Sequence, residues 1–136
     1  MMRAAVLSLL LLAGCATAPA PLGAQSPQGD WLTVSIAGQP AEGEANVHFD
    51  APGGAVHGSA PCNSFGGMTY TLAGARILIG GHGQMTLRAC ADPARQERER
   101  IFTDVLFKSP HFRIDGDVMQ LTGPSGDVVE LRRAAP

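Results

Sequence analysis

Residues 92–107, which read Asp-Pro-Ala-Arg-Gln-Glu-Arg-Glu-Arg-Ile-Phe-Thr-Asp-Val-Leu-Phe, decide the fold of this chain. They predict a helix, because Asp92 suits the N-cap and Pro93 suits the first helical position, where its missing N–H costs nothing. The apolar stripe of this helix consists of Ile101, Phe102, Val105 and Leu106. A stripe of this kind has to be covered, so we expect the helix to pack on a sheet.

The sequence on both sides of the helix predicts short antiparallel strands, because apolar and polar residues alternate between turn residues. Leu32, Val34 and Ile36 are expected to share one face of a first strand, and Val47 and Phe49 one face of a second. The other expected strands are Ala55–Gly58, Met68–Leu72, Arg76–Ile79, Met85–Arg88, His111–Asp115, Val118–Thr122 and Val128–Arg132. Gly80–Gly83 is expected to break the chain between two of them.

One helix among about eight strands predicts an α+β domain. We expect a strongly curved antiparallel sheet or a cracked β-barrel, with the helix packed at its open side.

The N-terminus predicts export. Arg3 precedes an apolar run that is too short to span a bilayer, and the run ends in Leu12-Ala13-Gly14-Cys15, which resembles a bacterial lipobox. We expect residues 1–14 to be a signal peptide, with Cys15 lipidated as the mature N-terminus. The alternative is an ordinary cleaved signal in which Cys15 has no role. Ala16 after the cysteine favours the outer membrane, with the protein facing the periplasm.

Removal of the signal leaves 122 of the 136 residues, enough for one domain with a modest core. Residues 15–29 are expected to form an extended tether, because they are rich in proline and uncharged, and residues 30–136 to form the domain. The formal net charge of −2 becomes −3 once Arg3 is removed, and no large basic cluster is present. This charge argues against nucleic acid as a partner.

Two motifs resemble a known family. Residues 61–70 read Pro-Cys-Asn-Ser-Phe-Gly-Gly-Met-Thr-Tyr, and residues 85–90 read Met-Thr-Leu-Arg-Ala-Cys. Together with the tryptophan strand at Trp31 and the C-terminal hairpin, they resemble the META domain of the HslJ heat-inducible proteins. The resemblance implies a role in envelope stress tolerance, without an established reaction. The family usually has glycine where this chain has Pro61, so we expect a local difference in the backbone there.

Cys62 and Cys90 are the only cysteines left once Cys15 is lipidated, and the expected compartment is oxidising. We therefore predict a disulfide between them, worth about 3 to 4 kcal/mol in the chain-entropy model. The alternative is a catalytic thiol at Cys62 with a histidine base, but such a thiol has to stay reduced.

A candidate binding surface is formed by two segments that the disulfide would bring together. It consists of Asn63, Gly66, Gly67, Tyr70, Thr86 and Arg88. The structural alternative is that Asn63 and the glycines serve turns, and that Thr86 and Arg88 belong to a strand edge. Glu97 and Glu99 are expected to lie in solvent at the helix start, where acidic side chains suit the helix dipole.

No metal or cofactor is expected, because the four histidines show no metal-ligand spacing. No combination of nucleophile, base and orienting residue can be assembled, so we expect a binding protein rather than an enzyme.

Three functions are compatible with the sequence. The first is a stress-related envelope lipoprotein of the META type, which binds an envelope protein or a lipid. The second is a chaperone similar to secretin pilots, which would hold a lipid tail or an amphipathic peptide in an open groove between sheet and helix. The third is an inhibitor of lysozyme or another hydrolase, with Ser64–Tyr70 as the inserting loop.

Overall fold

The computed structural model describes residues 25–136. The predicted signal peptide and Cys15 lie outside the described residues. The strands are β1 (Gly29–Ile36), β2 (Gln39–Pro40), β3 (Asn46–Phe49), β4 (Ala55–Ser59), β5 (Ser64–Ala73), β6 (Arg76–Met85), β7 (His111–Asp115), β8 (Val118–Thr122) and β9 (Val128–Arg133). The helix is α1 (Pro93–Phe107).

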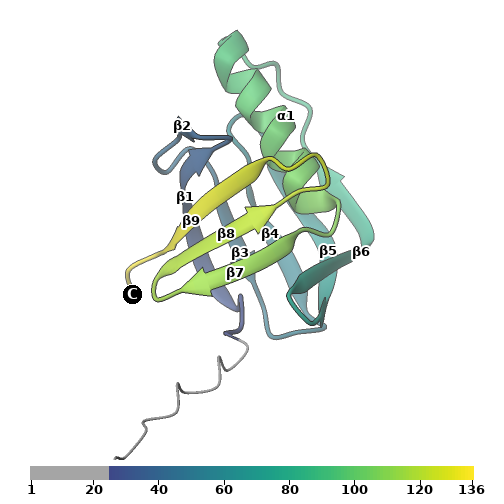
Figure 1. Cartoon of the computed structure of the whole chain (residues 1–136). Coiled ribbons are helices and arrows are strands. Elements are labelled where there is room, and N and C mark those ends of the chain that lie inside the picture. The colour runs from purple at the N-terminus through teal and green to yellow at the C-terminus, as the bar shows by residue number, and fades with distance from the viewer. Residues whose placement is uncertain (1–24) are drawn as a thin grey trace, which may run out of the picture.

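The strands form a closed antiparallel barrel (Figure 1). Their order is β1-β3-β4-β5-β6-β7-β8-β9, and β9 pairs with β1 to complete the ring. The short β2 adds only to the edge of β1. The predicted α+β class with a β-barrel and one packed helix is therefore confirmed.

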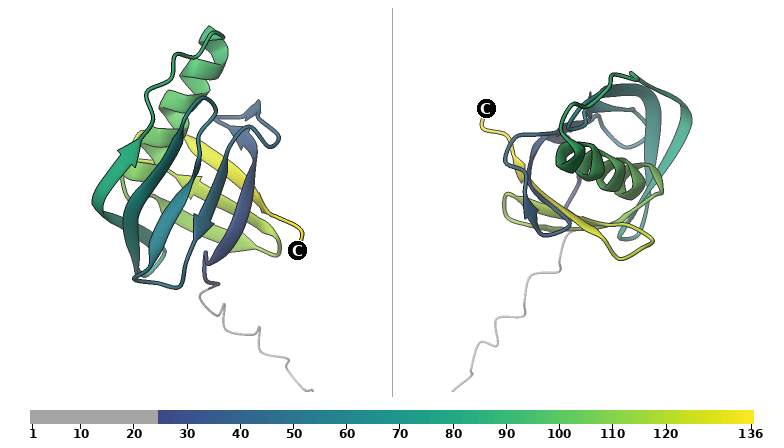
Figure 2. Two further views of the ribbon diagram at one scale, coloured as in Figure 1. Left: turned by 180° about the vertical axis from the view of Figure 1, so that it is seen from behind. Right: turned by 90° about the horizontal axis from the view of Figure 1, so that it is seen from above.

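Helix α1 covers one end of the barrel (Figure 2). Asp92 is its N-cap, and Asp92 Oδ1 accepts a hydrogen bond from the Ala94 N–H at 2.9 Å. From the predicted stripe, Phe102, Val105 and Leu106 are fully buried among the side chains inside the barrel. The helix closes the core because its apolar side faces into the open end of the barrel.

The predicted inward face of β1 is wrong at Leu32, which is 43% exposed. Trp31 and Thr33 are buried instead, and the register with β9 shifts between Thr33 and Ser35. Because this bulge adds one residue on β1, Ile36 returns to the buried side. By contrast Val47 and Phe49 are both buried on β3, as predicted.

The predicted break at Gly80–Gly83 is also wrong. β6 runs through these glycines to Met85 and stays paired with β5 as far as Phe65. A register shift between Gly66 and Met68 and a positive φ of 85° at Gly81 accommodate the bend. The predicted separate strand Met85–Arg88 is absent from the described residues, and Thr86 begins a loop.

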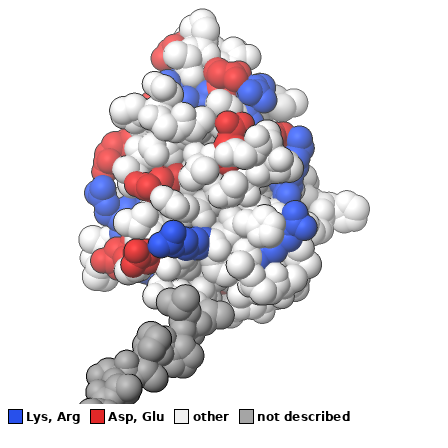
Figure 3. Space-filling model, in the orientation of Figure 1, with Lys and Arg blue, Asp and Glu red and all other residues white. Residues whose placement is uncertain are grey.

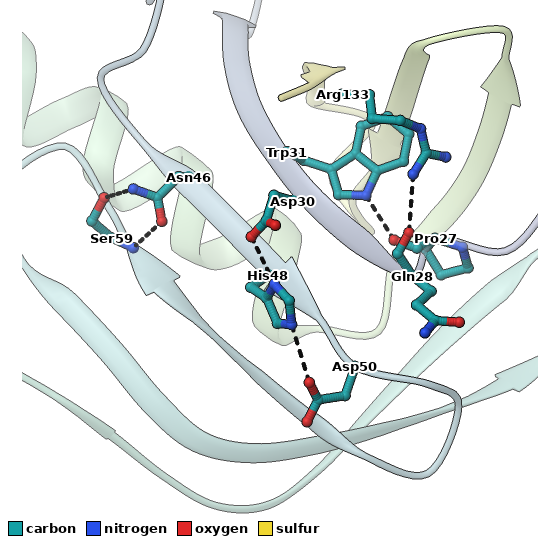
Figure 4. Close-up of polar contacts among 9 residues, drawn as sticks. All are labelled: Pro27, Gln28, Asp30, Trp31, Asn46, His48, Asp50, Ser59 and Arg133. Atoms are coloured by element: carbon teal, nitrogen blue, oxygen red, sulfur yellow. Dashed lines mark hydrogen bonds and ion pairs between the residues drawn. The ribbon is translucent and has the colours of Figure 1, made fainter. Parts of the chain in front are cut away.

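The last residues of the predicted tether belong to the barrel. Pro27 is buried, and its carbonyl accepts a hydrogen bond from Trp31 Nε1 at 2.6 Å (Figure 4). Arg133 lies over the Trp31 ring at 4.3 Å and donates to the Gln28 carbonyl at 3.0 Å. These contacts fix the point at which the chain enters β1, on the opposite side of the barrel from α1 (Figure 1).

Candidate functional site

Three segments of the chain meet at one place: the turn before β5, the loop after β6, and helix α1. Their shared polar residues, which we call the Asn63 cluster, are Cys62, Asn63, Thr86, Arg88, Cys90 and Glu99. The cluster includes three residues of the predicted binding surface, Asn63, Thr86 and Arg88, and both predicted disulfide cysteines.

Asn63 is the centre of this cluster and is 8% exposed. Its Oδ1 accepts hydrogen bonds from Thr86 Oγ1 at 2.9 Å and from the Arg88 N–H at 2.6 Å. Its Nδ2 donates to Glu99 Oε1 at 2.5 Å. Because the amide uses both its oxygen and its nitrogen inside the protein, its role is to join the three segments.

The prediction that the Glu99 carboxylate lies in solvent is wrong. The other oxygen of Glu99, Oε2, accepts the Cys62 N–H at 2.5 Å, so the side chain links the helix to the turn. Cys62 is joined to Cys90 by a disulfide with a Cα–Cα distance of 5.6 Å. Glu97, by contrast, is exposed and pairs with Arg100 at 2.6 Å. The two glutamates therefore differ although both are in the first half of α1.

Tyr70 does not lie on a surface, and this part of the predicted binding surface is wrong. The side chain is 1% exposed, and its hydroxyl donates to the Asp50 carbonyl at 2.5 Å. Burial raises the pKa of the Tyr70 phenol, and the nearby Asp50 carboxylate adds to the effect. The Tyr70 side chain points into the barrel because it alternates along β5 with the exposed side chains of Thr69 and Thr71.

Gly66 and Gly67 lie in strand β5, at the shift in register with β6. Gly67 has a φ of 76°, and a Cβ there would come within 3.0 Å of the His82 carbonyl oxygen. A glycine is therefore required for backbone reasons. The predicted inhibitor loop Ser64–Tyr70 is a paired strand with buried Phe65 and Met68, so it does not project as a loop.

An apolar hollow lies beside β6, close to the C-terminal end of α1. We call it the β6 notch. Its cavity volume is about 240 Å³. It is lined by Met68, Ile79, Gly80, Gly81, Gly83, Gln84, Met85 and Phe107. Apart from Met68, which belongs to the predicted inserting loop Ser64–Tyr70, none of these residues is a predicted site residue, because Gly80–Gly83 is expected to break the chain.

The barrel strands bring together a second polar group, which the sequence analysis did not predict. We call it the His48 cluster, and it consists of Asp30, His48, Asp50 and His57. His48 Nδ1 lies 2.7 Å from Asp30 and His48 Nε2 lies 3.0 Å from Asp50 (Figure 4). The His57 ring stacks on His48 at 4.7 Å. The β3–β4 register, which pairs His48 with His57, explains this proximity.

The two carboxylates favour the protonated form of His48. The hydrogen bond to Asp30 is the largest influence and raises the pKa of His48 above 6.5, against a smaller lowering by burial. The pKa of Asp50 lies below its usual value, first because of the Ala55 N–H and then because of His48. Within residues 25–136, no group of three or more His, Cys, Asp or Glu side chains is arranged to hold a metal ion.

Comparison with known families decides the relationship. The profile of the META domain matches residues 24–136, which include the whole barrel and its helix. The chain belongs to the META domain family. This match extends six residues further toward the N-terminus than the domain boundary predicted at residue 30, and it includes buried Pro27.

Two solved structures have a similar fold but are distant in sequence. One NMR structure has a TM-score of 0.62 and 18% identity, covering 77% of this chain and 88% of the other. Another, from Burkholderia xenovorans, has a TM-score of 0.53 and 20% identity, covering 79% of each chain. At these identities the likeness supports the fold alone. A search of curated proteins found no significant match.

META membership supports a non-catalytic, envelope-type domain, and META domains are not a known enzyme family. In the described part of the chain, no helix has the length and apolar character needed to cross a membrane.

Proposed function

We propose that this META protein is anchored to the cell envelope by lipid on Cys15 and acts by binding another molecule, in a role linked to envelope stress. The lipobox-like sequence that ends at Cys15 supports the anchor. The outer membrane, with the domain facing the periplasm, is the location that Ala16 favours. The resemblance to the HslJ proteins supports the stress-related role.

The observation that carries the binding function is the β6 notch. Its lining combines Met68, Ile79, Met85 and Phe107 from β5, β6 and α1, and it opens to the outside of the barrel. Apolar hollows of this kind are the usual place for a ligand group on a globular domain. The polar residues of the Asn63 cluster, by contrast, are engaged with one another.

The same notch favours one form of the second candidate, a pilot-like chaperone. It lies between the sheet and the helix, where that candidate requires a groove. Its volume of about 240 Å³ is below the range of about 300 to 1,000 Å³ typical of pockets for drug-sized ligands. The interior of the barrel beside it is filled by buried apolar side chains. A peptide side chain therefore fits this notch better than a long lipid tail.

Site-specific photo-crosslinking in the native envelope tests the binding function. A photoreactive residue replaces Gln84, which is exposed and lines the notch, in the full-length chain. The matched control carries it at Gln96, which is exposed near the start of α1. We expect a cross-linked species from position 84 alone. Equal products from both positions, or none from position 84, would contradict the proposal.

Mass spectrometry of the N-terminal peptide tests the anchor separately. The wild-type peptide is expected to begin at Cys15 and to carry diacylglycerol, and the protein is expected in the outer-membrane fraction. Cys15→Ser removes the acylated sulfur, so the variant should lose the lipid and the membrane association. Thr17→Ser is the control and should retain both. An unmodified wild-type N-terminus beyond Cys15 would reject the anchor.

A further inference from the structure

One edge of the barrel is only partly paired. β6 pairs with β5 from Arg76 opposite Ala73 to Met85 opposite Phe65, with a register shift that leaves His82 and Gly83 without a partner on β5. Its pairing with β7 is limited to Arg76 opposite His111. Among residues 25–136, no strand lies on the outer side of Gly80–Met85. This part of β6 is therefore a strand edge inside an otherwise closed ring.

At the start of this edge, groups of the loop before β7 accept hydrogen bonds from β6 in place of a paired strand. The Ile77 N–H donates to the Pro110 carbonyl at 3.0 Å, and the Ile79 N–H donates to Ser109 Oγ at 3.1 Å. Beyond Ile79, the described residues provide no comparable partner on this side of β6. Unpaired backbone N–H and C=O groups on an edge are a template for another strand.

The exposed edge lacks charged side chains and proline, two of the features that usually prevent such pairing. Natural edges are protected by charged side chains, proline or a covering segment, whereas Gly80–Gln84 reads Gly-Gly-His-Gly-Gln. Position 83 also has little room for a side chain, because a Cβ on Gly83 would lie 2.5 Å from Met68 Cγ. The bare backbone is thus accessible from outside.

The β6 notch lies directly beside this edge, since Gly80, Gly81, Gly83 and Gln84 belong to both. Alternate side chains of an added strand point to the same face of the sheet, so one of those on the notch side would enter the notch. A volume of about 240 Å³ accommodates one or two apolar side chains, and Met68 and Phe107 supply apolar contacts.

The charge around the opening indicates the kind of peptide. Arg76 is exposed and donates from Nε to the Ser109 carbonyl at 3.1 Å, at the point where β6 leaves β7. Within the described residues, Arg76 forms no ion pair with a carboxylate, and Lys108 follows Phe107 close by, paired with Asp104. In Figure 3, Lys and Arg predominate on the right-hand side, where Figure 1 shows β5 and β6. An acidic group on the ligand complements this charge.

We propose that the free edge of β6, Gly80–Met85, binds an extended acidic peptide of another protein, which adds to the barrel as a strand. One apolar side chain of the peptide fills the β6 notch, and an acidic residue further along meets Arg76. The backbone hydrogen bonds supply affinity, and the notch and Arg76 supply selectivity. This proposal rests on the binding function proposed above and names its ligand class.

Fluorescence anisotropy with a labelled peptide tests the proposal on the purified full-length protein. The probe is the acidic peptide TVTLTDE. One control peptide, TVTLTKK, reverses the charge, and another carries N-methyl groups at alternate residues and cannot pair along one edge. We expect only TVTLTDE to bind, with the amides of Gly80–Met85 protected from hydrogen exchange in its presence. Equal binding of either control, or no protection in this segment, would overturn the proposal.

Variants separate the charge from the notch. Arg76→Glu should weaken binding by about fivefold or more through charge reversal, whereas Arg113→Glu on β7 should stay within about twofold. Gly80→Trp should abolish binding, because the indole would fill the notch. The fold should tolerate this substitution, because a Cβ at Gly80 would have no atom within 4 Å. Thr71→Trp, exposed on β5, is the matched control. If either Arg76→Glu or Gly80→Trp binds the peptide as tightly as the wild type, the proposal is overturned.

Two other occupants give distinct results. A second copy of the chain would protect Gly80–Met85 in the absence of peptide, with a dimer in sedimentation at the same concentration. An acyl chain would displace the peptide when sodium laurate is added below its micelle concentration. Either result would overturn strand addition by a peptide. Crosslinks from position 84 in the envelope would still support the proposed binding function, so the two failures can be distinguished.

Discussion

The Asn63 cluster and the His48 cluster use similar groups in different surroundings. Both join segments of the barrel through a carboxylate and a nitrogen-bearing side chain. Asn63 is 8% exposed, whereas the Asp30 and Asp50 side chains are 69% and 49% exposed. Buried polar groups that lose a partner are costly, but exposed ones are resolvated by water. The Asn63 cluster is therefore expected to stabilise the fold, whereas the His48 cluster is expected to contribute weakly and in a pH-dependent way.

Removal of the disulfide should have the largest effect. In the double variant Cys62→Ala with Cys90→Ala, the unfolded chain gains the freedom of a loop with a sequence separation of 28. We expect a loss of about 3 to 4 kcal/mol in the free energy of unfolding, measured by urea denaturation. Wild-type protein in a strong reductant should lose a similar amount. A loss below about 1 kcal/mol in both samples would contradict the importance of this cross-link.

The two glutamates of α1 provide the sharpest test of burial. Glu99→Ala leaves the Cys62 N–H without its acceptor and leaves Asn63 Nδ2 with only the longer hydrogen bond to the Arg88 carbonyl at 3.4 Å, so we expect a loss of about 2 to 3 kcal/mol. Glu97→Ala removes only an exposed ion pair with Arg100 and should change little. The measurement is again urea denaturation. Equal losses for the two variants would show that the Asn63 cluster is no more stabilising than a surface pair.

Tyr70→Phe should have an intermediate effect. It removes the hydrogen bond from the Tyr70 hydroxyl to the Asp50 carbonyl without changing the packing of the ring against Phe49. We expect a loss of about 1 kcal/mol, measured by thermal or urea unfolding. Thr69→Val, on the exposed side of the same strand, is the control and should change less. A larger loss for Thr69→Val would reverse the assigned orientation of β5.

The barrel and helix could be predicted because they depend on local patterns. Asp92-Pro93 and the stripe at Phe102, Val105 and Leu106 define α1 without reference to the rest of the fold. The alternation on β3 was equally clear. The prediction is wrong at Gly80–Gly83, because glycines typical of a turn can remain in a strand when the neighbouring strand provides a bulge.

The candidate sites were harder to predict because they depend on register and on contacts between distant segments. The residues of the Asn63 cluster were identified, but Glu99 was placed in solvent, since its partners lie 36 and 37 residues away in sequence. The His48 cluster depends on which residues of β3 and β4 are opposite one another. The β6 notch requires knowing that β7 pairs with β6 at one position only. A single sequence carries none of this information directly.

The smallest expected effect is the pH dependence of the His48 cluster. The pKa of His48 is raised, so its contribution to stability is present below its ordinary value of 6.5 and is lost as pH rises through the higher folded-state value. The pKa of Asp50 is lowered, so its contribution is present above its ordinary value of 3.8 and is lost as pH falls through the lower folded-state value. The cluster should therefore stabilise the fold most between these two regions.

Unfolding measured at about pH 5.5 and about pH 8.5 tests this prediction. Wild-type protein should lose its His48 contribution at the higher pH, whereas His48→Gln should lack that part of the change. His111→Gln is the control, because His111 lies on β7 outside the cluster. High salt should reduce the difference between wild type and His48→Gln, since exposed charges are screened. If His48→Gln and wild type show the same pH dependence, the two short contacts of His48 contribute no coupled protonation to stability.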